Sequence, residues 1–295
     1  MSGLLPDVDP DGLLEYSVVF TDRSLNHMSQ NFQEVMTDIS STLKKVYSAE
    51  AMAIIPGGGT YAMEAVARQF AANKKTLVLR NGWFSFRWTQ IFEAGDIPAS
   101  STVLKARQHE TGRQAAFAPA PIEEVVATIK SEKPAVVFAP HVETSSGIIL
   151  PDDYMKEVAE AVHSVGGLFV LDCVASGTIW VDMKEVGVDV LISAPQKGWS
   201  ASPCSGLVLL SQQACSVMET TTSSSFACDL KKWFQIMQAY ENGGHAYHAT
   251  LPTDALRKFR DVMKETEEYG FDKVKAEQQA LGDGVRELMS KKQFR

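Results

Sequence analysis

The stretch of sequence that decides the fold reads GLFVLDCVASG at residues 167–177 and DVLISAPQKGW at residues 189–199. Each segment contains a short apolar run, which is typical of a strand buried on both faces of a parallel sheet. Asp172 directly follows the first run, and Lys197 follows the second. Because ligands gather at the carboxyl ends of the strands in such sheets, we expect Asp172 and Lys197 to lie near one ligand site.

Short apolar runs alternate with amphipathic segments along most of the chain. Strands are expected at residues 51–55, 76–79, 135–139, 168–171, 188–193 and 206–210, and helices at 31–46, 61–72, 86–94, 122–130 and 153–165. This alternation predicts an α/β fold with a mostly parallel central sheet that is covered by helices. The Thr/Ser run at 220–225 is predicted to be a loop.

The two ends of the chain differ in composition from its centre. Residues 1–25 are interpreted as an N-terminal arm, because the first fifteen are rich in Pro, Asp and Gly. Residues 26–252 would form the large domain. The chain becomes helical and charged after Pro252, so residues 253–295 are interpreted as the helical start of a smaller C-terminal domain that is cut short.

Composition and charge narrow the function classes. The 295 residues are 45% hydrophobic, and no apolar run is long enough to span a bilayer. A formal charge of −8 offers no general attraction to nucleic acid or anionic lipid, so neither is expected as a partner. The four cysteines lack CxxC spacing and no signal sequence is visible, which favours a reducing cytoplasm. The six histidines show no zinc-binding spacing, so no metal is expected.

A glycine-rich turn lies between the first expected strand and the helix that follows it. The segment PGGGT (56–60) would present backbone N–H groups and the positive end of that helix to an anion such as phosphate. Gly57, Gly59 and Ala62 also fit a dinucleotide-binding fingerprint, but the acidic residue that should follow about twenty positions later is absent. A turn that binds no ligand is the third possibility.

Asp172 and Lys197 suggest a cofactor. A buried carboxylate without a basic neighbour in the sequence needs a cationic partner, and a protonated pyridine nitrogen would serve. A lysine between Pro195 and Gly198, just after an apolar strand, is suited to imine formation because desolvation favours a neutral amine. Taken singly, Asp172 could instead cap the next turn, and Lys197 could be a solvated surface residue.

Six segments of the chain resemble class V aminotransferases that depend on pyridoxal 5'-phosphate (PLP), in particular the alanine-glyoxylate and serine-pyruvate aminotransferase group. They follow the order of that family: NHMS (26–29), PGGGTYAMEA (56–65), HVETSSG (141–147), DCVAS (172–176), SAPQKGW (193–199) and YHATLP (247–252). The resemblance covers the chain from about residue 26 to its end. It implies the fold type I of PLP-dependent transferases.

The resemblance also implies roles for individual residues. Lys197 would carry PLP as a Schiff base and shuttle protons, and Asp172 would bind the pyridine nitrogen. The other implied cofactor contacts are Gly58, Gly59, Thr60 and Gln196 at the phosphate, Thr144 or Ser145 at the phenolic oxygen, Val174 beneath the ring, and Phe84 or alternatively Trp83 above it. Tyr247 and Thr250 would reach the phosphate of a neighbouring subunit, which implies a homodimer with shared active sites.

The expected reaction is transamination between a small amino acid and a 2-oxo acid such as glyoxylate or pyruvate. The alternatives are another class V reaction, of the desulfurase or lyase type, and a PLP-binding module without catalysis. Two departures from the family bear on the substrate. Its usual Pro-Gly-Pro start is replaced by FTDRS (20–24), and no residue here corresponds to the arginine that holds the substrate carboxylate in the family's C-terminal domain.

Overall fold

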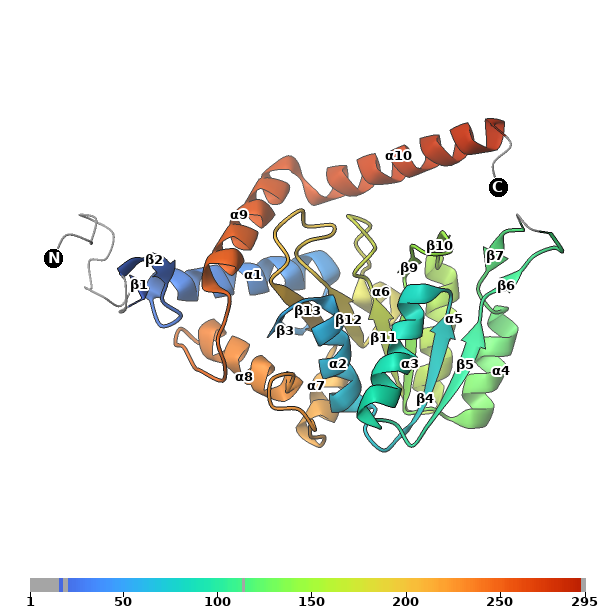
Figure 1. The fold of residues 1–295 in the computed structure, drawn as a ribbon, viewed down its shortest axis with the longest axis horizontal. Helices are drawn as coiled ribbons and strands as arrows, with labels where there is room; N and C mark the ends of the chain where they lie inside the picture. The colour runs from blue at the N-terminus through green and yellow to red at the C-terminus, as the bar shows by residue number, and fades with distance from the viewer. Residues whose placement is uncertain (1–15, 18–20, 113–114, 293–295) are drawn as a thin grey trace.

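The computed structural model describes residues 16–17, 21–112 and 115–292, so the irregular arm expected at residues 1–15 lies outside the described part. A seven-stranded sheet forms the centre of the molecule, in the order β3-β13-β12-β11-β8-β4-β5 (Figure 1). Its strands are β3 (Ala51–Pro56), β4 (Lys75–Arg80), β5 (Ser100–Lys105), β8 (Val136–Pro140), β11 (Leu168–Asp172), β12 (Val190–Ser193) and β13 (Ser205–Leu210). β13 is antiparallel to both of its neighbours, and the other neighbouring pairs are parallel. The expected α/β fold with a mostly parallel sheet is confirmed.

Helices cover both faces of the sheet. As a consequence, every residue of β8, β11, β12 and β13 is buried. α2 (Gly59–Phe70) packs on β13 and against α3 (Trp83–Gly95), which packs on β4. α5 (Asp152–Ser164) packs on β11 and against α4 (Ile122–Glu132), while α1 (Gln30–Tyr47) and α8 (Leu230–Glu241) pack on β3. The shorter elements are β1 (Tyr16–Ser17), β2 (Thr21–Leu25), β6 (Arg107–Gln108), β7 (Phe117–Ala118), β9 (Val142–Glu143), β10 (Ile148–Ile149), α6 (Met183–Val186) and α7 (Gln212–Glu219).

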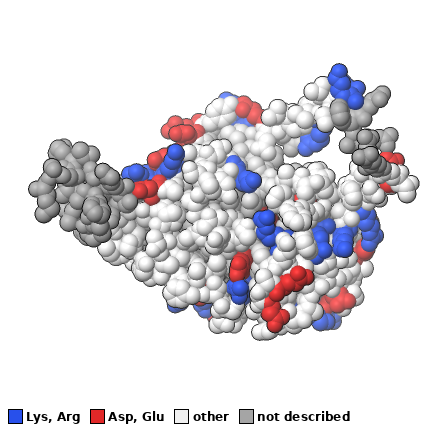
Figure 2. Space-filling model, in the orientation of Figure 1, with Lys and Arg blue, Asp and Glu red and all other residues white. Residues whose placement is uncertain are grey.

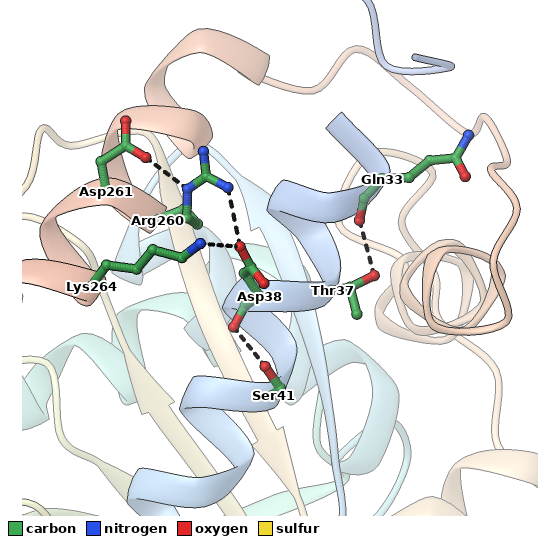
Figure 3. A network of polar contacts seen from close by, with 7 residues as sticks. All are labelled: Gln33, Thr37, Asp38, Ser41, Arg260, Asp261 and Lys264. Carbon is green, nitrogen blue, oxygen red and sulfur yellow. Dashed lines mark hydrogen bonds and ion pairs between the residues drawn. The ribbon is translucent and has the colours of Figure 1, made fainter. Parts of the chain in front are cut away.

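The last two helices leave the sheet. α9 (Thr253–Tyr269) packs on α1 through a buried face that includes Leu256 and Phe259. Figure 3 shows Asp38 of α1 between two cations of α9, with its Oδ2 3.1 Å from Arg260 Nη1 and 2.8 Å from Lys264 Nζ. Burial alone would raise the pKa of the Asp38 carboxyl, but the hydrogen bonds from the two cations outweigh burial and lower this pKa.

α10 (Phe271–Lys291) has no buried residue and projects along one side of the molecule in Figure 1. It touches the loop after β11, where the carbonyl oxygen of Gln278 (Oε1) accepts from Thr178 N at 2.6 Å. The helical character expected after Pro252 is therefore confirmed, while a domain boundary at that point stays a prediction. Among the helices that the structure describes, none is long and apolar enough to cross a membrane.

Most predicted elements agree with the structure, and the exceptions have physical reasons. β5 was not expected, because all six of its residues are exposed or half-buried and it has no continuous apolar run. α3 begins at Trp83 rather than at Phe86, because Glu143 accepts from the N–H groups of Phe84 and Ser85 in its first turn, and Ser85 Oγ accepts from the N–H of Gly82 at the N-cap. α7 and α8 were also not expected, and the Thr/Ser run between them is a loop as predicted.

Candidate active site

The loops that follow the carboxyl ends of β3, β4, β8, β11 and β12 meet around one pocket of about 160 Å³. Its lining residues are Gly59, Thr60, Met63, Phe84, Arg87, Val142, Thr144, Asp172, Val174, Ala175, Gln196 and Lys197. The structure thus brings together eight of the twelve residues that the sequence assigns to a cofactor. The four that do not line this pocket are Gly58, Ser145, Tyr247 and Thr250.

Lys197 is held at the pocket by a tight turn after β12. Ala201 N donates to the carbonyl oxygen of Pro195 across this turn at 2.9 Å. Gly198 lies so close to the backbone carbonyl of Gly177 that a Cβ atom would not fit there. The backbone on both sides of Lys197 is therefore fixed, while its side chain is exposed at the pocket.

Asp172 ends β11 in the middle of the sheet and faces the pocket. The residue is 8% exposed, and Val174 N donates to its Oδ1 at 3.0 Å. No other hydrogen bond reaches this carboxyl from the residues that the structure describes. Burial raises the pKa of Asp172 to about 6, since one backbone donor does not replace the lost water.

Asp189, at the start of β12, shows the opposite pattern at similar burial. Its Oδ2 accepts from Phe169 N at 2.8 Å and lies 2.8 Å from His163 Nε2, and its Oδ1 accepts from Ser211 Oγ at 2.9 Å. These contacts make Asp189 a structural carboxylate that joins neighbouring strands and loops. Asp172, in contrast, has unused acceptor capacity that is directed at a pocket.

The glycine-rich turn opens the start of α2 to the pocket. Gly57 has φ +122°, a backbone conformation that side-chain-bearing residues rarely adopt, and its N–H donates to the carbonyl oxygen of Cys204 at 2.9 Å. A Cβ atom on Gly59 would lie only 2.9 Å from Cγ2 of Val174. The space beside Gly58 is open, with nothing within 4 Å of a Cβ built there. An anion can therefore approach the N-terminal end of α2 closely.

Glu143 of β9 fixes the first turn of α3. Its Oε1 accepts from Phe84 N at 3.1 Å and from Ser145 Oγ at 2.6 Å, and its Oε2 accepts from Ser85 N at 2.8 Å. Ser145 Oγ in turn accepts from Trp83 N at 2.8 Å. Burial would raise the pKa of Glu143, but these hydrogen bonds outweigh burial and lower it. The carboxylate thus positions Phe84 at the pocket.

The structure separates two pairs of candidates that the sequence left open. Phe84 lines the pocket, whereas Trp83 does not and is 60% exposed. Thr144 lines the pocket, whereas the hydroxyl of Ser145 is occupied by Glu143 and by the start of α3. Sequence spacing could not separate these neighbours, because the choice depends on where α3 begins.

Three other predicted residues differ in their surroundings. Gln196 lines the pocket, and its Oε1 is buried without a hydrogen-bond partner among the described residues. Tyr247 and Thr250 are exposed on the loop between α8 and α9. The ring of Tyr247 lies 5.4 Å from the ring of His27, and 65% of the residue is accessible to solvent.

Sequence reasoning missed Glu143 and four lining residues: Met63, Arg87, Val142 and Ala175. Arg87 follows Phe84 by three positions, so the two share one face of α3. An expected helix start at Phe86 hid this spacing. The signal for Glu143 was its position just after β8, in a segment already chosen for its neighbours Thr144 and Ser145.

Charged side chains are scattered over the face of the molecule drawn in Figure 2. The formal charge of the chain is −8. Several Lys and Arg side chains lie on this face below α10, with Asp and Glu side chains among and beneath them.

The chain is similar to proteins of known activity. The family model "Aminotransferase class-V" matches residues 13–295. A 2-aminoethylphosphonate–pyruvate transaminase of Syntrophobacter fumaroxidans is 31% identical over 250 residues, which are 82% of this chain and 62% of that protein. The alanine–glyoxylate aminotransferase of Rattus norvegicus is 26% identical over 85% of this chain and 58% of its own length. The chain thus spans about three fifths of these curated relatives.

Solved structures agree with this result. An alanine–glyoxylate aminotransferase from Nostoc sp. superposes with a TM-score of 0.76 at 23% identity, covering 90% of this chain and 67% of that one. An aspartate aminotransferase of subgroup IV from Thermus thermophilus gives a TM-score of 0.71 at 27% identity, over 90% of this chain and 71% of that one. With the family model matching nearly the whole sequence and the fold matching these structures, the chain belongs to the aminotransferase class V family.

Proposed function

We propose that this chain forms a PLP-dependent site that transfers an amino group between a small amino acid and a 2-oxo acid such as glyoxylate or pyruvate. The observation that carries this proposal is the meeting of Lys197, Asp172 and the start of α2 in one pocket. An amine, a buried carboxylate and an anion-binding helix end match the aldehyde, pyridine nitrogen and phosphate of PLP. The names of the relatives, which include alanine–glyoxylate and 2-aminoethylphosphonate–pyruvate enzymes, support the substrate class.

The residues around the pocket fit this cofactor. Asp172 is buried with a raised pKa, and a protonated pyridine nitrogen would stabilise its ionised form. Gln196 Oε1 is buried without a donor, so the side chain has hydrogen-bonding capacity to spare. Gly59 and Thr60 leave the start of α2 accessible, and the open space beside Gly58 can admit a phosphate. PLP, when bound, would supply the electron sink that stabilises negative charge at the substrate α-carbon.

The groups of the protein would have separate tasks in this reaction. Lys197 Nζ would hold the cofactor covalently and, once displaced by the amino donor, would move the proton at the substrate α-carbon. Asp172 would keep a proton on the pyridine nitrogen. Phe84 and Val174 would enclose the ring from its two faces and exclude water, and Thr144 would contact the phenolic oxygen.

We also propose a homodimer in which Tyr247 and Thr250 reach the phosphate bound by the other subunit. Both side chains are exposed and stand outside the lining of their own pocket, so they are available to a second copy of the chain. Light scattering after size exclusion should give twice the chain mass, and Tyr247→Phe should weaken PLP binding. A monomer that binds PLP with full affinity would contradict this arrangement.

A desulfurase reaction is less well supported than transamination. Burial raises the pKa of the thiols of Cys173, Cys204, Cys215 and Cys228. None of the four lines the pocket described above. Because the thiolate is the reactive form, buried thiols with raised pKa values are poor nucleophiles.

The test begins with cofactor attachment. Purified protein mixed with PLP should develop a visible absorbance band, and borohydride followed by peptide mass spectrometry should place the modification on Lys197. Lys197→Ala should lose the band, whereas Lys184→Ala, at an exposed lysine outside the pocket, should keep it. Absence of the band in the wild-type protein, or its retention by Lys197→Ala, would refute the proposal.

Turnover then separates a transaminase from a binding module. L-alanine and 2-aminoethylphosphonate are tested as donors, each with glyoxylate and with pyruvate, and the keto product and new amino acid are quantified. Loss of amino group from the donor should equal its gain by the acceptor. Attachment without any exchange, across this panel, would favour a non-catalytic module, and release of sulfide from L-cysteine would favour the desulfurase alternative.

A further inference from the structure

Arg87 lies on the pocket side of α3 and forms no ion pair with the residues that the structure describes, although its positive charge partly offsets the effect of burial on the pKa of Asp172. Its Nη1 donates to Thr60 Oγ1 at 3.1 Å, and its Cζ lies 5.6 Å from the centre of the Phe84 ring. No ion pair joins Arg87 to a carboxylate within the described residues. A guanidinium carries five N–H donors in a planar fork, so most of its donors are free to bind a further acceptor.

Other arginines of the described chain show what a purely structural role looks like here. Arg68 pairs with Glu64, and Arg107 pairs with Glu124. Arg87 instead lines the pocket and contacts a hydroxyl and an aromatic ring. An unpaired cation at a pocket wall is placed to bind an anion from solution.

The position of Arg87 in the pocket indicates which part of a bound ligand its guanidinium would contact. Thr60 is the second residue of α2, beside the glycine-rich turn where the helix N-terminus favours an anion. The hydrogen bond from Arg87 to Thr60 therefore places the guanidinium at the same end of the pocket as that helix start. Lys197 is the other cation of the lining, and its amine would be bonded to the cofactor aldehyde. Arg87 is then the cationic side chain of the lining that could pair with a phosphate.

We propose that Arg87 binds the cofactor phosphate, together with Thr60 and the start of α2. This inference rests on the proposed PLP site and adds a residue to it. The aromatic face of Phe84 and the hydroxyl of Thr60 would hold the guanidinium in place before the cofactor arrives. Because Glu143 fixes the start of α3, Phe84 and Arg87 would act as one preformed wall that contacts both the ring and the phosphate.

The test compares PLP with pyridoxal, which has the same ring and aldehyde but no phosphate. Dissociation constants are measured by absorbance and tryptophan quenching with the full chain freed of cofactor. Arg87→Gln should weaken PLP binding at least tenfold and leave pyridoxal binding unchanged. Arg87→Lys, which keeps the charge but loses the fork, should give a smaller weakening that is again confined to PLP, and it replaces the Gln variant if that one does not fold.

Arg80→Gln is the matched control, because Arg80 also lies over an aromatic ring of α3 and donates to a threonine hydroxyl, but outside this pocket. It should bind both ligands as the wild-type protein does. Equal weakening of PLP and pyridoxal by Arg87→Gln would indicate a distorted pocket and overturn the proposal. Unchanged PLP binding with a raised KM for the amino donor would assign Arg87 to the substrate and also overturn it. If the wild-type protein attached no PLP at Lys197, both the proposed function and the proposed role of Arg87 would be wrong. If PLP were attached but Arg87→Gln had no phosphate-specific effect, only the proposed role of Arg87 would be wrong.

Discussion

Replacing Asp172 by asparagine should stabilise the cofactor-free protein while weakening its use of PLP. The carboxyl is buried with one hydrogen bond, and its pKa rises from 3.8 to about 6. A shift of about 2 pKa units corresponds to about 3 kcal/mol that the ionised group costs the folded state at neutral pH. Asparagine keeps an oxygen for the Val174 N–H but carries no charge, so the variant avoids this cost.

The sign of the pH dependence follows from the raised pKa. Well below pH 3.8 the carboxyl is protonated in both states, and it contributes no penalty. As the pH rises to about 6, the unfolded chain ionises first, so the penalty grows and is complete above this pKa. The free energy of unfolding of Asp172→Asn should therefore exceed that of the wild-type protein by up to about 3 kcal/mol at pH 7, and by roughly half as much at pH 5.

Urea unfolding of the cofactor-free chain, followed by tryptophan fluorescence at pH 5 and pH 7, measures this difference. Asp189→Asn is the control, because that carboxylate accepts hydrogen bonds from Phe169 and Ser211 and its loss should destabilise the protein at pH 7. Added PLP should stabilise the wild-type protein more than Asp172→Asn. The reasoning is refuted if Asp172→Asn is less stable than the wild type at pH 7, or if the difference does not change with pH.

Three further changes have defined outcomes. Glu143→Gln leaves one acceptor oxygen for the N–H groups at the start of α3, so it should lower the free energy of unfolding by about 1–3 kcal/mol and, by displacing Phe84, weaken PLP binding. Unfolding and PLP-binding curves of the variant measure both effects. An unchanged affinity for PLP would contradict the positioning role of Glu143. Asp38→Asn should cost under about 1 kcal/mol at pH 7, because its partly exposed ion pairs are screened. Because folding lowers the pKa of Asp38, the difference in the free energy of unfolding between the variant and the wild type should vanish as the pH falls through that pKa. The difference should also shrink in high salt at pH 7. Urea unfolding curves under each condition test both expectations. Gly198→Ala should lower the free energy of unfolding by about 1–3 kcal/mol and reduce labelling of Lys197 by PLP, because the new Cβ would collide with the backbone of Gly177. Gly284→Ala is the control, since this glycine lies on exposed α10 with open space around it. Equal stability of the two variants would contradict the packing argument.

The sheet could be predicted because its central strands are fully buried, and a run such as LFVL in β11 therefore has only apolar residues. β5 escaped prediction for the opposite reason: it is an edge strand whose exposed residues include Ser100 and Lys105. The same principle explains the start of α3. Its first turn is fixed by hydrogen bonds to Glu143, a residue far away in sequence. The local sequence around Trp83 therefore does not indicate where the helix begins.

The site divides in the same way. Lys197, Asp172 and Gly59 could be predicted because each follows an apolar strand and because the carboxyl ends of parallel strands share one edge. Arg87 could not, because its place at the pocket depends on the helical phase of α3 relative to Phe84. Local sequence thus indicates which strand ends carry chemistry, whereas side-chain direction on the covering helices requires the three-dimensional structure.

Three buried carboxyl groups near the strand ends show how the structure distinguishes support from chemistry. Glu143 and Asp189 are each saturated by several hydrogen bonds from backbone and side-chain donors of other segments, and both hold elements in place. Asp172 is buried to a similar degree but receives one backbone donor and faces the pocket. In the proposed PLP site a protonated pyridine nitrogen would use this free acceptor capacity of Asp172, and the parallel pairing of β11 and β12 brings Asp172 and Lys197 to the same edge of the sheet.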